Sequence, residues 1–406
     1  ARSKLALLIG AKRADALTRA VVPANTHPSM CRLVTLLHTK GREMVPVTAT
    51  RAALMELALF FDYVPDESWV QYPLEWVVER AYEAIAYAAE HPPTYDIGID
   101  FADMIFLPLA HNLLSPEYEL VVVDECQDMN AAQILIAQRV CSGRICVVGD
   151  DRQAIYAWRG ADSGSLDRLK HELHAEELPL VTTYRCGQAI VRAAQVLVPD
   201  IQAGPSNPEG LVDSQNYDYL LDSVLPGDFV LSRLNAPLVS LTLYFLRKGK
   251  RARMAGRDVG AGIQAILKRL KCYDGAPVED LLTRLEEWER KTVTRYAAYG
   301  HTALVDRCRD QAAMIRALAE EADTTGDLLR QIDWLFTDVQ DGQQIICSSV
   351  HKAKGLEANR VYLLQESLYR RGVSSEECNI EYVAITRAKQ HLTRVVGVSS
   401  LGQTRR

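Results

Sequence analysis

The sequence predicts an α/β protein with parallel sheets, built from two domains that carry helical insertions. Its 406 residues exceed the usual length of one domain and favour two or three. Short runs rich in Val, Ile and Leu alternate with segments of helical spacing, as expected for strands of a parallel sheet covered on both faces. The runs are LALLIG (5–10), ELVVVDE (119–125), RICVVGD (144–150), DFVLSRL (228–234) and RVYLLQ (360–365).

The composition changes along the chain and suggests where the domains lie. Residues 30–115 and 262–335 are rich in Ala, Leu, Glu and Arg at helical spacing, which indicates helical insertions. The Gly- and Pro-rich stretch at 203–210 predicts a boundary or hinge. We expect a first domain over 1–180 with a helical insertion at about 30–95, a second domain over 181–262 and 340–406, and a further helical insertion at 263–339.

The overall composition is that of a soluble globular protein, with 48% hydrophobic and 24% charged residues. No apolar run reaches the roughly 18 residues that span a bilayer, so we expect a cytoplasmic protein with no membrane partner. The net charge of −6 leaves nucleic-acid binding open, because that needs only a local basic track. The dense basic stretch 247–257 fits either such a track or a solvated surface. Cys126 and Cys146 lie in apolar runs and are expected to be reduced core thiols.

Acidic side chains follow the strand predicted at 119–125. Asp124 and Glu125 end it, and Gln127 and Asp128 come next. Ligands of open α/β sheets bind at the carboxyl ends of the strands. ATP hydrolysis needs a carboxylate to hold Mg²⁺ and a second group to activate water. Adjacent Asp and Glu supply both, although a solvated acidic turn would show the same residues.

A second predicted strand, at 144–150, is followed by polar and aromatic side chains. Gln153 comes first, then Tyr156, Trp158 and Arg159. Bases of single-stranded nucleic acid stack on aromatic rings without sequence preference, and Arg adds affinity for the backbone. The spacing therefore favours a single-strand contact, and two core aromatics are the alternative.

These segments resemble the UvrD/Rep family of superfamily 1 DNA helicases. DECQD (124–128) is similar to its Walker B box, and GDDRQAIYAWRGA (149–161) is similar to its motif III. The other matching stretches are IDFADMIFLPL (99–109), TTYRC (182–186, motif IV), SRLNAPL (232–238), SSVHKAKGLEANRVYLL (348–364, motif V) and EECNIEYVAITRAKQHL (376–392, motif VI). Because the boxes follow the family's order over most of the chain, the resemblance is specific. Trp158 departs from the more usual Phe.

The resemblance implies roles in nucleotide chemistry. Asp124 would hold Mg²⁺, and Glu125 would be the general base toward the attacking water. Gln153 would sense the γ-phosphate and couple it to DNA. Arg185 and Arg387 would contact the γ-phosphate as arginine fingers. The remaining nucleotide contacts would be Tyr184 on the adenine, Glu357 on the ribose, and Gly355.

The resemblance also implies DNA contacts and an overall architecture. The DNA-binding residues would be Thr26, His27, Tyr156, Trp158, Arg159 and His351. Two RecA-like domains of the P-loop NTPase type would hold ATP in the cleft between them, with single-stranded DNA across both. The implied activity is ATP-driven 3′→5′ translocation that unwinds duplex DNA. The implied partners are single-stranded DNA, junctions of single- and double-stranded DNA, and a loading or repair protein.

The phosphate-binding loop of this family, GxxxxGK[ST], matches no segment of the sequence. The stretch Gly10-Ala11-Lys12 lacks its first glycine and its hydroxyl residue. We favour a piece of a longer protein, with a non-hydrolysing relative or a loop from another chain as alternatives. We expect the 406-residue polypeptide alone to hydrolyse ATP poorly or not at all. The rival functions are a non-catalytic DNA-binding or regulatory relative and the helicase part of a recombination nuclease complex.

Overall fold

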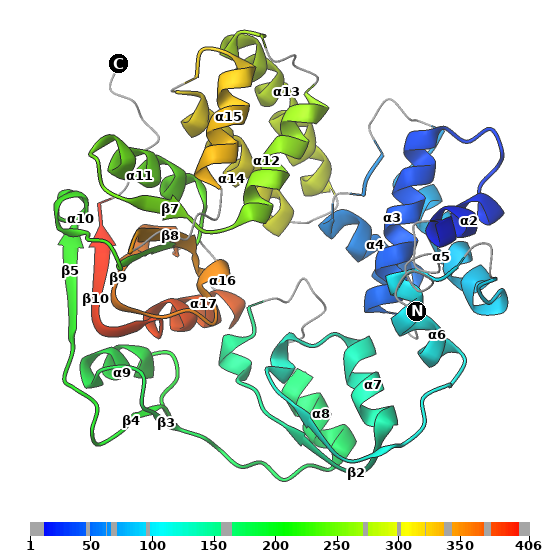
Figure 1. Cartoon of the computed structure of the whole chain (residues 1–406), viewed down its shortest axis with the longest axis horizontal. Helices are drawn as coiled ribbons and strands as arrows, with labels where there is room; N and C mark the ends of the chain where they lie inside the picture. The colour runs from blue at the N-terminus through cyan, green and yellow to red at the C-terminus, as the bar shows by residue number, and fades with distance from the viewer. Residues whose placement is uncertain are drawn as a thin grey trace. The chain divides into compact units, whose positions relative to one another are not determined.

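The chain divides between residues 176 and 177 into two units, each with its own parallel strands, in a computed structural model (Figure 1). The strand predicted at 5–10 lies outside the described residues. The structure describes residues 12–45, 49–61, 63–65, 71–94, 98–155, 165–270, 275–298, 302–320, 322–336, 343–368 and 375–397.

Helices make up the N-terminal part of the first unit (blue to cyan in Figure 1). Two of them begin at side chains that cap free backbone N–H groups: Thr50 accepts from Ala53 N, and Asp100 accepts from Asp103 N. The helices are α2 (Lys12–Val21), α3 (Pro28–Met44), α4 (Arg51–Phe60), α5 (Leu74–Glu90) and α6 (Phe101–Ala110).

Buried ion pairs connect these helices. The Arg42 guanidinium lies 2.7 Å from Asp100 Oδ2 and 2.6 Å from Asp103 Oδ1, and Arg13 Nε lies 3.0 Å from Asp103 Oδ2. His38 is fully buried beside them, with Nε2 3.0 Å from Thr18 Oγ1. Burial and then the charge of Arg42 lower the pKa of His38 to about 3, so its ring is neutral in the folded protein.

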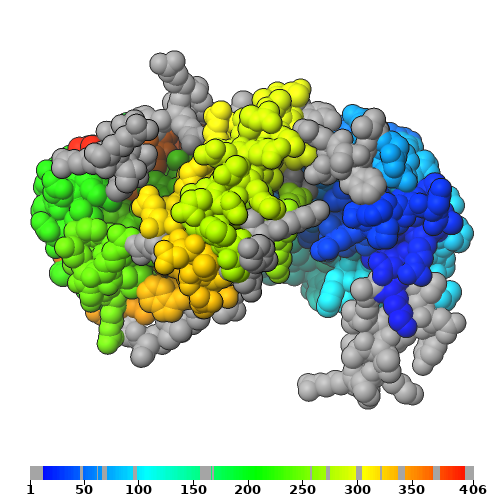
Figure 2. Space-filling view, turned by 90° about the horizontal axis from the view of Figure 1, so that it is seen from above, coloured from blue at the N-terminus to red at the C-terminus, as the bar shows by residue number. Residues whose placement is uncertain are grey.

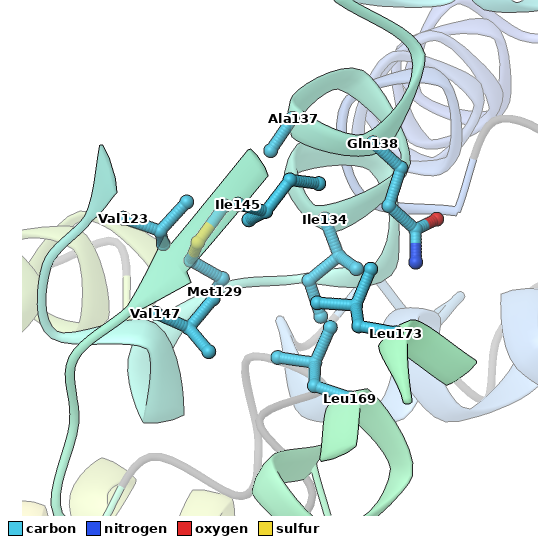
Figure 3. A pocket seen from close by; sticks show the side chains of 9 residues that line it. All are labelled: Val123, Met129, Ile134, Ala137, Gln138, Ile145, Val147, Leu169 and Leu173. Atoms are coloured by element: carbon cyan, nitrogen blue, oxygen red, sulfur yellow. The ribbon is translucent and has the colours of Figure 1, made fainter. Parts of the chain in front are cut away.

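The strands of the first unit are β1 (Tyr118–Val123) and β2 (Cys141–Val147), which pair in parallel. The connecting helix α7 (Ala131–Val140) begins at a capping box made by Asn130 and Gln133. Helix α8 (Ser165–Leu173) lies on the same face of the sheet as α7. Figure 3 shows strand residues Val123 and Val147 around a small apolar pocket that the two helices also line.

The other face of β1 and β2 is exposed. Leu120 is 54% and Val122 61% accessible, and Cys146 is exposed as well. The prediction of a sheet covered on both faces was therefore wrong for these strands, and so was the prediction of Cys146 as a core thiol. The reason is that α7 and α8 both pack on one face. Cys126 is fully buried, as predicted.

The second unit contains a six-stranded sheet in the order β5-β10-β9-β6-β8-β7, with every neighbouring pair parallel. Its strands are β5 (Leu211–Asn216), β6 (Phe229–Ser232), β7 (Ala252–Met254), β8 (Ile345–Ser349), β9 (Ala358–Leu364) and β10 (Ala388–Val396). All four residues of β6 are buried, which confirms the predicted two-sided burial for this sheet.

Helices cover both faces of this sheet because the chain moves across it first in one direction and then back. Right-handed crossovers place helices of the outward path on one face and helices of the return path on the other. The outward helices are α10 (Tyr217–Ser223) and α11 (Ala236–Arg247), and the opposite face carries α9 (Gln188–Gln195), α16 (Val350–Ala353) and α17 (Ser375–Ile385).

A helical insertion separates β7 from β8 and shares the core of the second unit. Leu281 and Ile315 of the insertion belong to the same buried cluster as Val230 of β6. Asp310 accepts hydrogen bonds of 3.0 Å from Asn235 N and Ala236 N at the start of α11. Figure 2 shows the outer surface of the insertion in yellow-green to orange. Its helices are α12 (Arg257–Arg269), α13 (Val278–Ala298), α14 (Thr302–Ala319) and α15 (Thr325–Leu335).

The stretch 203–210 is part of the second unit, so it is not the boundary between the two units, and a hinge there stays a prediction. It follows β4 (Gln202–Ala203), which pairs with β3 (Thr182–Thr183). Its backbone also accepts hydrogen bonds from the start of α9, of 2.9 Å from Gln188 N to Pro208 O. Its glycines and prolines therefore serve a tight local turn.

Candidate functional site

The first group of predicted site residues lies at the carboxyl end of β1. Asp124 and Glu125 are exposed, and Asp124 Oδ1 accepts a 2.9 Å hydrogen bond from Glu125 N. Glu125 has left-handed backbone angles, φ 51° and ψ 40°, and caps the short 3-10 helix η1 (Cys126–Asp128). Such a conformation costs a non-glycine residue about 1–3 kcal/mol and is concentrated at functional sites.

Gln127 joins this strand end to the end of β2. Its side chain is fully buried, and its Nε2 donates a 2.5 Å hydrogen bond to Glu125 Oε2. Its Oε1 accepts a 3.1 Å bond from Asp150 N. A Cβ on Gly149 would lie 2.6 Å from that Oε1. Glycine at 149 therefore leaves the space that the amide needs.

The network continues from Asp150 to Gln153. Asp150 Oδ2 accepts a 2.8 Å hydrogen bond from Gln153 Nε2, and Asp150 Oδ1 accepts one of 2.9 Å from Arg152 N. Gln153 ends the 3-10 helix η2 (Asp151–Gln153). The structure thus brings Glu125 and Gln153, two residues predicted from separate motifs, into one hydrogen-bonded chain.

The donors around Asp124 fit Mg²⁺ only together with a phosphate ligand. Across the part of the chain that the structure describes, no group of three or more His, Cys, Asp and Glu side chains could hold a metal. Mg²⁺ usually takes one or two protein carboxylates and completes its shell with water and substrate phosphates. An exposed carboxylate at a strand end meets that requirement.

The apolar pocket in Figure 3 is a packing defect between α7, α8 and the sheet. Gln138 is its one polar lining side chain. It offers no charged group to a phosphate, so the exposed strand ends are the better candidates for nucleotide chemistry.

The second group of predicted site residues lies before β9 and β10. Glu357 Oε2 is 2.8 Å from Arg185 Nε, and Glu357 Oε1 forms an ion pair with Lys389. The register between β10 and β9 shifts between Ala388 and His391, so Lys389 lies in a β-bulge, which can redirect a side chain. The hydrogen bond from Lys389 is the main cause of a lowered pKa at Glu357. Sequence reasoning missed Lys389, because a bulge leaves no mark in the pattern.

Arg387 is 1% exposed and is bound to backbone carbonyls. Its Nε donates to Val383 O over 3.0 Å, and its Nη1 donates to Leu356 O over 3.1 Å. Burial and then the nearby charge of Arg185 lower its pKa to about 10, so the guanidinium stays charged at neutral pH. The structure therefore gathers Arg185, Glu357 and Arg387 at the amino ends of two strands.

Tyr184 presents an exposed ring beside this cluster. Tyr184 as a whole is 72% accessible, and its ring lies against Gly204, where a Cβ would be 2.5 Å from the ring carbon Cδ1. The buried Asn207 side chain donates to Thr183 O over 2.8 Å and to Cys186 O over 2.7 Å. These bonds fix the backbone on both sides of Tyr184. Sequence reasoning missed Asn207 because its stretch resembled a hinge.

Two predicted residues of motif V occupy different places. His351 lies in α16, beyond the carboxyl end of β8, whereas Glu357 precedes the amino end of β9. Since β8 and β9 run in the same direction on either side of β6, these positions are at opposite ends of the sheet. Gly355 has φ +80°, a conformation that favours glycine, in the connection between them.

The predicted DNA contacts of the first unit are partly described. His27 caps α3, and its Nδ1 accepts a 3.2 Å hydrogen bond from Ser29 N. Thr26 is 8% exposed, and its Oγ1 has no hydrogen-bond partner among the described residues. The other three predicted contacts lie outside the described residues: Tyr156, Trp158 and Arg159.

Part of the basic stretch 247–257 serves the fold. Lys250 Nζ donates to Leu221 O over 2.8 Å and to Val224 O over 3.2 Å, at the end of α10. Lysine at a helix C-terminus satisfies carbonyls that lack helical partners. This lysine is therefore accounted for without a DNA contact.

Family models match both units, and curated proteins match part of the chain. Residues 66–174 match the UvrD/REP helicase N-terminal domain, and residues 281–396 match the UvrD-like helicase C-terminal domain. A probable DNA helicase II homolog of Mycoplasma pneumoniae is 33% identical over 124 residues, which cover 27% of this chain and 17% of that protein. The ATP-dependent DNA helicase Rep of Buchnera aphidicola is 36% identical over 111 residues, covering 25% and 17%.

The ATP-dependent DNA helicase PcrA of Bacillus subtilis is 32% identical over 112 residues, covering 25% of this chain and 15% of that protein. The matched part thus spans less than a fifth of the length of these curated relatives. Within the described residues, no helix has the length and hydropathy that crossing a bilayer requires. The matched domains, the parallel sheets and the order of the boxes agree, and the chain belongs to the UvrD/Rep family of helicases with its RecA-like α/β fold.

Proposed function

We propose that this protein is an ATP-dependent DNA helicase that moves 3′→5′ on single-stranded DNA and unwinds duplex DNA. The observation that carries the proposal is the hydrogen-bonded chain from Glu125 through Gln127 and Asp150 to Gln153, in a member of a helicase family. Through Gln127 and Asp150 it links a carboxylate that could activate water to a polar side chain that could recognise phosphate, which supports the proposal. The relatives named DNA helicase support DNA as the substrate.

In the first unit, the three predicted nucleotide-site residues have distinct tasks. Glu125 orients the attacking water and accepts its proton, because a carboxylate is the base available at this strand end. Gln153 hydrogen-bonds the γ-phosphate. Asp124 would hold Mg²⁺, which when bound neutralises negative charge on the phosphate oxygens.

In the second unit, positive side chains act on the same triphosphate. Arg185 and Arg387 stabilise the charge that develops on the transferred phosphoryl group. Tyr184 stacks on the adenine, and Glu357 and Gly355 contact the nucleotide nearby. Because Arg185 is paired with Glu357 and Arg387 with carbonyls, phosphate binding requires an exchange of these partners.

DNA contacts complete the proposal. Thr26, His27 and His351 bind the single strand, together with Tyr156, Trp158 and Arg159. Single-stranded DNA and its junctions with duplex DNA are the substrates, and a loading or repair protein is the expected partner.

The test compares the gene-encoded protein with its Glu125→Gln variant. We expect hydrolysis of ATP stimulated by single-stranded DNA and displacement of a strand from a 3′-tailed duplex. Glu125→Gln should lower the hydrolysis rate by about 10²- to 10⁴-fold and leave DNA affinity unchanged. Glu119→Gln, the same substitution at an exposed site of β1, is the matched control and should retain the rate.

Two outcomes would change the conclusion. A protein that binds DNA but never hydrolyses ATP would be a regulatory relative instead of a motor. Displacement from 5′-tailed duplexes alone would contradict the proposed polarity.

A further inference from the structure

We propose that Gln127 is a positioning residue that holds the Glu125 carboxylate and links it to Gln153. The inference rests on the proposed function, since it assigns Gln127 to the hydrolysis step. Gln127 itself would touch neither water nor nucleotide, because its side chain is fully buried. Its effect passes through the two side chains that do.

The chemistry of an amide suits this task. Gln127 donates through Nε2 to Glu125 Oε2 and accepts through Oε1 from Asp150 N, so both ends of one planar group are used. Only an amide side chain donates at one end and accepts at the other with this shape. A glutamate here would face Glu125 with an oxygen that cannot donate, and a methionine would make neither bond.

The bridge is not required to join the strands. Backbone hydrogen bonds already connect the two strand ends, from Val148 N to Val123 O over 2.7 Å and from Cys126 N to Val148 O over 3.0 Å. The side chain of Gln127 adds bonds that reach a functional carboxylate on one side and the backbone of Asp150 on the other. Asp150 in turn holds Gln153 through a 2.8 Å hydrogen bond.

The network explains how an exposed base can be preorganised. An exposed glutamate ordinarily samples several rotamers, and misplacement of a base by about 1 Å can lower a rate by roughly 10²-fold. The bond from Gln127 restricts Glu125 before substrate arrives. A phosphate bound at Gln153 would shift Asp150 and thereby Gln127. Binding at the γ-phosphate position would in this way change the position of the Glu125 carboxylate.

The decisive variant is Gln127→Met in the gene-encoded protein, with Gln133→Met as the matched control. Gln133 is also a glutamine of the first unit, but it is exposed, and its side chain makes one hydrogen bond, accepted by Oε1 from Asn130 N in the capping box of α7. We expect Gln127→Met to lower kcat for ATP by about tenfold or more, with KM within about twofold. Gln133→Met should retain kcat, even if its melting temperature falls equally.

Amide hydrogen exchange supplies a readout that does not depend on turnover. The Asp150 amide should exchange faster in Gln127→Met and at the wild-type rate in Gln133→Met. Gln127→Glu, which keeps an oxygen for Asp150 N, is the second variant. In this variant the Asp150 amide should still exchange slowly, because an oxygen remains to accept its hydrogen bond. The kcat should fall nevertheless, because no N–H remains to donate to Glu125.

A double-mutant cycle tests the link to Gln153. If Gln127 acts through this chain, Gln127→Met and Gln153→Met together should lower kcat by less than the product of the single effects. Suppose that the wild type hydrolyses ATP but Gln127→Met keeps its kcat, or loses no more of it than Gln133→Met does. This result would overturn the role of Gln127 and leave the proposed function standing. A wild type without hydrolysis overturns the proposed function, and the catalytic role of Gln127 with it.

Discussion

The acidic network of the first unit and the arginine cluster of the second are built in opposite ways. In the first, the exposed carboxylate of Glu125 at the carboxyl end of β1 is held by an uncharged amide, that of Gln127, which also accepts from the backbone N of Asp150 after β2. In the second, charged groups at the amino ends of β9 and β10 are paired with one another or buried, as Arg387 is. Under the proposed function, the first group could accept a ligand without losing an ion pair, whereas the second would first have to release the partners of Arg185 and Arg387.

The largest expected effect is on ATP hydrolysis, and it should be accompanied by a loss of stability in the second group but not in the first. Arg387→Ala should lower hydrolysis by about 10³-fold or more and destabilise the second unit by about 3 kcal/mol, because the buried carbonyl of Val383 and the partly buried carbonyl of Leu356 lose their donor. Asp124→Asn should also impair hydrolysis but change unfolding free energy by less than about 0.5 kcal/mol, since its side chain is exposed. Urea unfolding alongside ATPase assays would measure both. If the two variants were equally stable, the buried arginine would not be a structural element and the contrast between the two groups would be wrong.

A second contrast concerns the sheets that carry the two groups. Leu231 of β6 is fully buried, so Leu231→Ala should lower the unfolding free energy by about 2–5 kcal/mol. Val122 of β1 is 61% exposed, so Val122→Ala should change it by less than about 0.5 kcal/mol. A large loss from Val122→Ala would show that this face of β1 is covered in solution.

Acid should weaken the first unit through His38. Its pKa is about 3 in the folded protein, below the ordinary value near 6.5. As the pH falls, His38 is therefore protonated at a higher pH in the unfolded chain than in the folded protein. Above pH 6.5 His38 is neutral in both states and does not lower the free energy of unfolding. As the pH falls from 6.5 toward 3, protonation of the unfolded chain lowers this free energy progressively. Between pH 7 and 5 the loss should be about 2 kcal/mol.

Hydrogen exchange of α3 amides at the two pH values would measure this loss. His38→Gln should show a flatter pH profile, and His27→Gln, at the exposed cap of the same helix, should keep the steep one. Equal pH profiles for wild type and His38→Gln would exclude this role of His38.

A small effect on stability is also expected from the ion pairs of the second group. Glu357→Gln removes its pairs with Arg185 and Lys389, yet the unfolding free energy should change by less than about 1 kcal/mol, because all three side chains are over a third exposed. Melting temperatures at low and high salt would measure it. A loss of several kcal/mol would mean that this cluster is a structural element.

The sequence predicted those features that depend on local pattern. The apolar runs at 119–125 and 360–365 became β1 and β9. The exposed face of β1 was not predictable, because a strand that is apolar on both faces shows the same residues whether or not a helix covers it. Cys146 was misjudged for this reason.

Contacts between distant residues were also beyond the pattern. Gln127 is visible in the acidic box, but its partner Asp150 is 23 residues away. The bond from Asn207 to Thr183 O spans 24 residues within a stretch that resembled a hinge. Motifs therefore supply the candidate site residues, and the structure was needed to find which contacts position them.

The central claim, that carboxylates of one unit and arginines of the other act on one γ-phosphate, can be tested by ligand affinity. The measurement is the ratio of affinities for ADP-aluminium fluoride and for ADP in wild type, Glu125→Gln and Arg185→Ala. Both variants should lower this ratio by about tenfold or more, because both groups would contact the transferred phosphoryl group. A ratio that falls in Glu125→Gln but stays at the wild-type value in Arg185→Ala would contradict the account.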